Sequence, residues 1–235
     1  MGDLSGRVAM VTGASGNLGR AVVECLSGRG AKAVLVDRDA QRLGEAFDAI
    51  PDRLLAGGVD LMAPGALDPI IQQALGRFGR LDILVHTVGG FRAGQSVHET
   101  PFETWDLMLD LNLRTTLVAL RAVIPTMLAQ RSGKIVTVAA RAALGGAANM
   151  AAYAAAKAAV LRLTESLAAE VRESGINVNC VLPGTLDTPE NRRDVPQADF
   201  SKWVAPAAVA EVIAFLVSDG AAAVHGAAVP VVGLS

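Results

Sequence analysis

Tyr153 and Lys157 are the residues whose types and spacing most clearly indicate chemistry. They stand four positions apart in the alanine-rich run MAAYAAAKAA, and Tyr153 is the single tyrosine of the chain. On a helix, this spacing puts two side chains on one face, one turn apart. A neighbouring ammonium favours the phenolate, so Lys157 is predicted to lower the pKa of the phenol from about 10 and to allow proton exchange near neutral pH. The alternative is a core tyrosine beside an exposed lysine.

A glycine-rich turn, TGASGNLG at residues 12–19, follows an apolar run and precedes a helical pattern. Its glycines let the backbone turn tightly and approach a pyrophosphate, while the helix N-terminus supplies amide donors. Because the strand–turn–helix context is present, the turn is predicted to bind a dinucleotide, with a plain glycine-rich turn as the alternative. The predicted cofactor-binding residues of the turn are Gly13, Ser15, Gly16, Asn17, Leu18 and Gly19.

Acidic residues end the next two predicted strands. Asp37, about twenty residues beyond the turn, can accept hydrogen bonds from both ribose hydroxyls of NAD and repel the additional phosphate of NADP. Arg38 could instead pair with that phosphate, so NAD(H) is favoured and NADP(H) stays an alternative. Asp60, followed by Leu61, is predicted to reach the adenine. The alternatives are a solvated strand end for Asp37 and a turn or capping residue for Asp60.

Short β-rich runs alternate with helical patterns, and this order predicts the elements that position these residues. Strands are predicted at 7–12, 32–37, 53–60, 81–90, 133–140, 176–184 and 227–232, and helices at 18–27, 39–49, 65–77, 102–130, 150–174 and 206–218. Buried-type strands separated by helices indicate a parallel sheet covered on both faces. No linker divides residues 1–235, so one dinucleotide-binding catalytic domain is expected. The irregular, charged segment 187–203 is expected to be a lid, with a merely solvated loop as the alternative.

The composition argues against several other classes of protein. Hydrophobic residues make up 51% of the 235 residues and charged residues 19%, which indicates a compact domain. A net charge of -2 without a dense basic run predicts neither a nucleic-acid nor a membrane partner. Two distant cysteines and the lack of a signal-peptide pattern favour a cytoplasmic protein with reduced thiols. The three histidines are scattered along the chain, so no metal site is predicted.

Together, the turn TGASGNLG, Asn112, the Tyr153–Lys157 pair and Pro183-Gly184 resemble, in this order, the short-chain dehydrogenase/reductase family. The resemblance runs nearly end to end. It implies a doubly wound Rossmann-type α/β sheet of about seven mostly parallel strands, with helices on both faces. It also implies a nicotinamide cofactor, hydride transfer with a small-molecule substrate, and a homodimer or homotetramer.

The same resemblance implies the roles of individual residues. Tyr153 would be the proton donor in reduction, and Lys157 would also hold the nicotinamide ribose. Asn112 would hold a water that relays protons to Lys157, with an ordinary helix-interior amide as the alternative. The further cofactor-binding residues that it implies are Gly89, Pro183, Gly184 and Thr188.

The chain departs from the family pattern at three places. Asn17 stands at the usual middle glycine of the turn, and His86-Thr87-Val88-Gly89 replaces Asn-Asn-Ala-Gly. Most important, Ala140 occupies the position of the catalytic serine. Losing that donor would cost on the order of ten- to a thousandfold in rate on an ordinary ketone, so Ala140 indicates an activated, conjugated acceptor. Together with Ala140, segment 181–203 is similar to the quinonoid dihydropteridine reductases of this family.

Two other functions stay open. One is a general carbonyl or 3-oxoacyl thioester reductase that works without the serine. The other is a non-catalytic dinucleotide-binding sensor, which Ala140 motivates and the intact Tyr153, Lys157 and Asn112 argue against. Arg141 is expected to be solvated, with reach into the pocket as the alternative, and His86 is expected to be a hydrogen-bonded strand-end residue.

Overall fold

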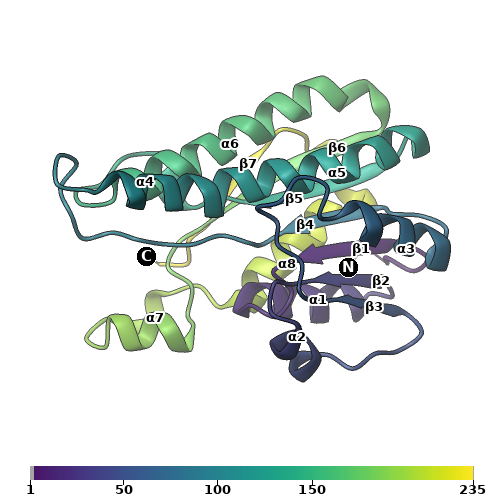
Figure 1. The fold of residues 1–235 in the computed structure, drawn as a ribbon, viewed down its shortest axis with the longest axis horizontal. Coiled ribbons are helices and arrows are strands. Elements are labelled where there is room, and N and C mark those ends of the chain that lie inside the picture. Colours follow the sequence, from purple (N-terminus) through teal and green to yellow (C-terminus); the bar gives the residue numbers. More distant parts are fainter. Residues whose placement is uncertain (1–2, 235) are drawn as a thin grey trace.

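The computed structural model describes residues 3–234 (Figure 1). Within them a seven-stranded sheet has the order β3-β2-β1-β4-β5-β6-β7, and all of its pairings are parallel. The strands are β1 Val8–Thr12, β2 Lys32–Val36, β3 Arg53–Ala56, β4 Ile83–His86, β5 Gly133–Val138, β6 Ile176–Pro183 and β7 Ala228–Val231. The order reverses between β1 and β4, which is the switch point where open α/β sheets bind ligands beyond their carboxyl ends.

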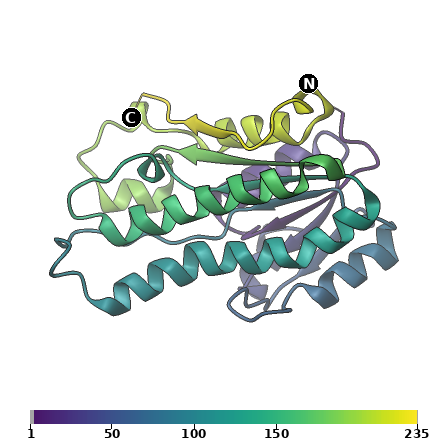
Figure 2. The same ribbon diagram turned by 90° about the horizontal axis from the view of Figure 1, so that it is seen from above.

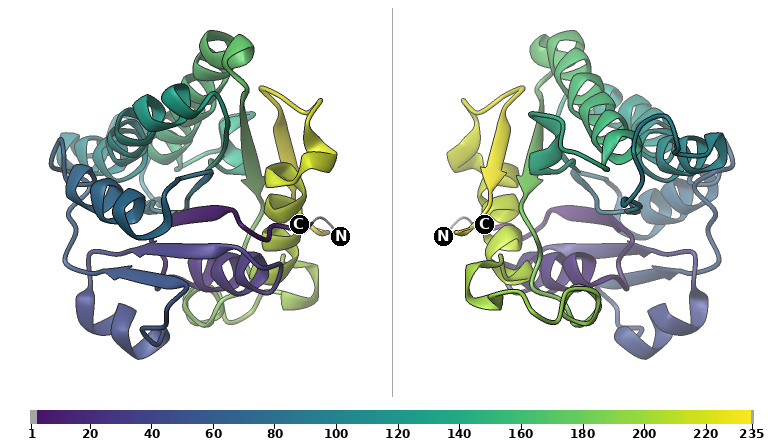
Figure 3. Two further views of the ribbon diagram at one scale, coloured as in Figure 1. Left: turned by 90° about the vertical axis from the view of Figure 1, so that its right-hand side faces the viewer. Right: turned by 90° about the vertical axis from the view of Figure 1, so that its left-hand side faces the viewer.

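Helices cover both faces of the sheet (Figure 3). They are α1 Asn17–Ser27, α2 Ala40–Ala46, α3 Asp68–Phe78, α4 Phe102–Met108, α5 Thr115–Gln130, α6 Ala151–Val171, α7 Pro189–Asp194 and α8 Pro206–Val217. Side chains alternate along β1: Ala9 and Val11 pack in the core with α1 and α8, and Val8 and Met10 pack in the core with α3, α5 and α6. The predicted doubly wound fold is therefore confirmed.

The long helices α5 and α6 run along the same face of the sheet (Figure 2). Alanine is the best helix former, and α6 is built largely from it, so its 21 residues form as the sequence predicted. α3 ends at Gly79, whose φ of 80° is the left-handed conformation that glycine adopts without strain. Within residues 3–234, no helix is both long and apolar enough to cross a membrane.

Several predicted boundaries were wrong. The helix expected over 102–130 is interrupted by a π-helical turn at Leu109–Arg114, which holds Asn112. β4 ends at His86 and β3 at Ala56, because the residues that follow leave the sheet with no further ladder partner. The segment 187–203, predicted to be irregular, contains α7 and a short 3₁₀ turn at Phe200–Lys202.

Candidate active site

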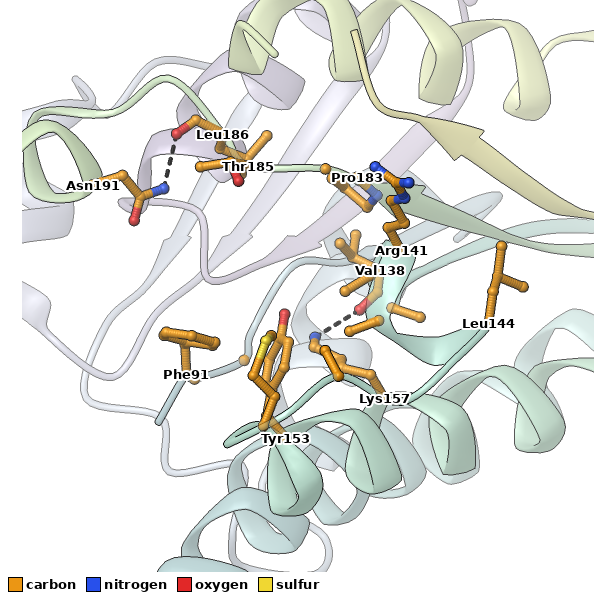
Figure 4. Close-up of a pocket in the computed structure, with 18 of the residues that line it drawn as sticks. Phe91, Val138, Arg141, Leu144, Tyr153, Lys157, Pro183, Thr185, Leu186 and Asn191 are labelled. Carbon is orange, nitrogen blue, oxygen red and sulfur yellow. Dashed lines mark hydrogen bonds between the residues drawn. The ribbon is translucent and has the colours of Figure 1, made fainter. Parts of the chain in front are cut away.

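A cavity of about 920 Å³ opens at the carboxyl edge of the sheet (Figure 4). Its lining comes from the chain just beyond β4, β5 and β6, from the start of α6, and from the chain that leads into α7. Tyr153 and Lys157 lie on its floor, and the Tyr153 hydroxyl points into the open space. Leu18, Gly89, Pro183 and Gly184 also line it, so the structure brings predicted residues from four separate parts of the sequence to one place.

The two side chains of the predicted pair lie together on α6. Lys157 is only 6% exposed, and its Nζ donates a hydrogen bond to the Val138 carbonyl over 3.0 Å. The same nitrogen lies 5.9 Å from the centroid of the Tyr153 ring. The alternative of an exposed helical lysine is therefore excluded. A buried ammonium beside a phenol at the floor of a cavity is an arrangement suited to moving protons.

The expected lowering of the phenol pKa was wrong. Burial raises the pKa of Tyr153 to about 12 and, in the same way, lowers the pKa of Lys157 to about 8. Both shifts arise because an apolar environment disfavours the charged form of either group. Lys157 donates to the Val138 carbonyl while lying beside the phenol ring, so desolvation outweighs the attraction that the spacing suggested.

Asn112 fastens the backbone that follows β4. Its Nδ2 donates to the carbonyls of Met108 at 2.8 Å and Gly90 at 3.1 Å, and its Oδ1 accepts from the Gly90 amide at 3.2 Å. A Cβ added at Gly89 would lie 2.8 Å from Asn112 Oδ1 and 3.1 Å from Lys157 Nζ. Gly89 therefore fits between the two side chains only because it has none. The predicted water relay from Asn112 to Lys157 stays a prediction.

The glycine-rich turn fits a pyrophosphate. Gly13 has a φ of 70°, and a Cβ at Gly19 would lie 2.1 Å from the Gly13 carbonyl oxygen, so neither position accepts another residue without strain. No side chain caps α1 at Gly16, which leaves the amide groups of its first turn for an anion. Asn17 Nδ2 donates to Glu190 Oε2 at 2.7 Å and so joins the turn to α7.

Asp37 also holds this turn. Its Oδ2 accepts from the Ser15 amide at 2.9 Å and the Ser15 hydroxyl at 2.8 Å. Asp37 is therefore more than a solvated strand end, and Arg38 beside it is exposed. Asp60 is exposed, and its Oδ1 accepts a hydrogen bond from the Met62 amide at 2.9 Å, which is the contact expected of the alternative, a turn residue. Leu61 is buried in the core.

Thr188, a predicted cofactor-binding residue, and His86 lie outside the cavity lining. Thr188 is buried and caps α7, with its Oγ1 accepting from the Asn191 amide at 3.2 Å. His86 is buried, its Nδ1 lies 2.8 Å from Thr12 Oγ1, and burial with the nearby Lys157 lowers its pKa to about 3. It is therefore a neutral, hydrogen-bonded strand-end histidine, as expected.

Just beyond β5, the position of the family's catalytic serine carries no hydroxyl, because it is occupied by Ala140. Ala140 lines the cavity, and the nearby Thr137 hydroxyl is buried and paired with Thr164 Oγ1 at 2.7 Å. Arg141, expected to be solvated, is exposed and also lines the cavity, because the chain turns there into the 3₁₀ turn Arg141–Ala143.

The sequence interpretation missed many of the cavity residues, among them Phe91, Thr185 and Asn191. Phe91 and Thr185 directly follow Gly89-Gly90 and Pro183-Gly184, and this adjacency was an available signal. Phe91 packs edge to face on Tyr153, with ring centroids 4.8 Å apart and an interplanar angle of 85°.

The sequence profile described as short chain dehydrogenase matches residues 7–199. The chain belongs to this family. It is an NAD(P)H-dependent oxidoreductase of the short-chain dehydrogenase type. The parallel seven-stranded sheet agrees with that assignment.

Relatives within the family cover almost the whole chain. A subunit of (2S)-[(R)-hydroxy(phenyl)methyl]succinyl-CoA dehydrogenase from Thauera aromatica is 33% identical over 98% of this chain and 96% of its own. The 3-oxoacyl-acyl-carrier-protein reductase of Escherichia coli (strain K12) is 34% identical over 95% of each chain. A crystal structure of NAD⁺-bound xylitol dehydrogenase has a TM-score of 0.90 at 26% identity, covering 98% of this chain and 99% of that one.

Proposed function

We propose that this short-chain dehydrogenase is an NADH-dependent reductase of a small conjugated acceptor, with a quinonoid dihydropteridine as the named candidate. The supporting observation is Ala140, which presents a methyl group to the cavity where the family has its serine. An acceptor that is already electron-poor needs less stabilisation of developing negative charge than a plain ketone. One positioned acid, Tyr153, is then sufficient.

In this proposal each residue has a defined task. The bound nicotinamide supplies the hydride. The phenol of Tyr153, protonated at neutral pH because its pKa is raised to about 12, donates the proton to the reduced acceptor. Lys157 holds the nicotinamide ribose. Asn112 fixes the Gly89-Gly90 turn and holds a water that relays protons from solvent to Lys157. The turn around Gly13 and Gly16 and the helix N-terminus of α1 hold the pyrophosphate.

The segment 187–203 is proposed to act as the lid of a single catalytic domain. Its two ends are joined by the bridge between Leu186 and Val204, and its helix α7 reaches the cofactor turn through Glu190 and Asn17. Within the described residues, the Asn17–Glu190 hydrogen bond is the one polar contact between this segment and the glycine-rich turn. A loop whose ends are joined and which has one such contact is suited to move as one piece. Assembly into a homodimer or homotetramer and a cytoplasmic location remain predictions.

Cofactor choice is expected to depend on the charge of Asp37. The change Asp37→Asn keeps an oxygen for Ser15 but removes the carboxylate, so the preference of kcat/KM for NADH over NADPH should fall about tenfold or more. Asp39→Asn is the matched control, because that neighbouring carboxylate caps α2 through the Arg42 amide. A wild-type enzyme that prefers NADPH, or a variant with an unchanged ratio, would contradict the proposal.

A second candidate is a 3-oxoacyl thioester reductase, which the full-length similarity to the Escherichia coli enzyme supports. Steady-state rates of NADH oxidation with quinonoid dihydropteridine, an ortho-quinone, an acyclic 3-oxo ester and a 3-oxoacyl thioester decide between the two. Faster turnover of the conjugated acceptors supports the first proposal. Faster turnover of the oxo ester and thioester rejects it in favour of the second.

Restoring the hydroxyl tests the role of Ala140 directly. The change Ala140→Ser is expected to raise kcat/KM for the acyclic 3-oxo ester about ten- to a hundredfold, while conjugated acceptors change by less than about threefold. Ala142→Ser is the control, because Ala142 also lines the cavity but does not occupy the serine position. Equal gains for both acceptor types would show that the missing donor does not select the substrate.

A further inference from the structure

Phe91 has a position that none of the roles above uses. It lies directly after Gly89-Gly90, lines the cavity and is 53% exposed. One part of its ring packs on the ring of Tyr153 at a centroid distance of 4.8 Å, edge to face. An apolar ring that is half exposed beside the proton donor presents a surface to whatever occupies the cavity.

The position of this ring is fixed from behind. The residue before it, Gly90, is held at both its amide and its carbonyl by the buried Asn112 side chain. A Cβ at Gly90 would lie 2.7 Å from Leu111 Cδ1, so the turn is also packed closely against the π-helical turn. Asn112 therefore fixes the backbone turn from which Phe91 extends, and the ring itself packs on Tyr153.

The cavity around Phe91 is lined largely by apolar side chains and glycines. Within the described residues, its lining contains two aromatic side chains, Phe91 and Tyr153. In Figure 4, Phe91 lies on one side of Tyr153 and Lys157 on the other, and the Tyr153 hydroxyl points into the open space of the cavity. Gly145 and Gly146 continue the lining beyond Leu144, and a Cβ at either would meet nothing within 4 Å.

We infer that Phe91 is a specificity-determining residue that selects flat, conjugated acceptors by packing against their ring, an inference that rests on the proposed function. A planar ring beside Phe91 gains aromatic contact over its face, while a heteroatom at its edge meets the Tyr153 hydroxyl. A flexible acyclic chain gains only the burial of its apolar surface and lacks the contact between two rings. The discrimination therefore comes from the aromatic character of position 91 in addition to its apolar volume.

The test compares Phe91→Leu and Phe91→Tyr with the wild type on quinonoid dihydropteridine, an ortho-quinone and an acyclic 3-oxo ester. Phe91→Leu is expected to lower kcat/KM for the two flat acceptors about three- to tenfold, mainly through KM, and to change the oxo ester less than about twofold. Phe91→Tyr is expected to keep the wild-type selectivity. Phe102→Leu is the control, because Phe102 is 83% exposed at the start of α4 and outside the cavity lining.

Two outcomes overturn the inference. The first is that Phe91→Leu lowers kcat/KM equally for all acceptors through a fall in kcat. That result would mean that Phe91 only supports the position of Tyr153. The second is read without turnover: a Kd of the ortho-quinone for the NAD⁺-loaded protein, measured by calorimetry, that stays unchanged in Phe91→Leu instead of rising about three- to tenfold as expected. If the wild type reduces no acceptor, the proposed function fails, whereas a ratio of Kd values near one rejects the role of Phe91.

Discussion

Replacing Tyr153 by phenylalanine is expected to lower kcat/KM for the best acceptor about a thousandfold while the Kd for NADH changes less than about twofold. The substitution removes one oxygen and keeps the ring that packs on Phe91 and lies near Lys157. A positioned general acid contributes about a hundred- to ten-thousandfold in rate, and the phenol is the acid in the proposed reaction. Steady-state kinetics and NADH fluorescence titration measure the two quantities.

The same variant separates catalysis from sensing. A Tyr153→Phe protein that retains full activity would show that another group donates the proton. If neither protein turns over any acceptor and both bind NADH, the chain is a dinucleotide sensor. Because the pKa of Tyr153 is raised to about 12, the phenol does not titrate between pH 6 and 9 and should not change the rate of reduction in that range. A fall in the rate between pH 6 and 9 would therefore report the titration of another group.

Replacing Lys157 by methionine is expected to abolish most activity and yet to stabilise the fold. Activity should fall about a hundredfold or more, because the ribose loses its cationic partner and the proton donor loses its neighbour. Burial lowers the pKa of Lys157 from 10.5 to about 8. At 1.36 kcal/mol per pKa unit, keeping this buried lysine charged at neutral pH costs the folded protein roughly 3 kcal/mol. Losing the bond to the Val138 carbonyl offsets about 1 kcal/mol of that gain.

The net stabilisation of about 2 kcal/mol corresponds to a rise in Tm of roughly 4–8 °C for a chain of this size. It also has a pH signature. The unfolded lysine keeps its proton to higher pH than the folded one, so wild-type stability rises between pH 8 and 10.5 and the advantage of the variant fades over that window. Calorimetric melts at pH 7 and pH 10 measure this, and an advantage that grows with pH would contradict it.

Lys134→Met is the matched control for this effect. Lys134 is 9% exposed on β5, burial lowers its pKa, and its Nζ donates to Asn177 Oδ1 at 2.6 Å outside the cavity lining. Its replacement is expected to alter stability while kcat/KM stays within about twofold. A large loss of activity in Lys134→Met would mean that the loss in Lys157→Met reports general damage to the fold.

Local patterns in the sequence were enough to predict a parallel sheet covered on both faces, and to single out the glycine-rich turn and the Tyr153–Lys157 pair. The apolar runs that became β1, β2 and β5 are short and buried on both faces, so their assignment needed no knowledge of neighbours. Gly13 and Gly19 are required by the tight turn itself, and Tyr153 and Lys157 share a face because of helix geometry alone. Each of these inferences depends on residues that are close together in the chain.

Only the tertiary structure decided how charge and shape act in the cavity. The pKa values of Tyr153 and Lys157 move apart because distant segments exclude water from them, which no spacing along α6 reveals. The bonds of Asn112 to Gly90 and the place of Phe91 beside Tyr153 likewise join segments more than twenty residues apart. Spacing along the chain therefore identified the proposed proton donor and its neighbour, whereas their protonation and the lining of the cavity depend on packing between distant elements.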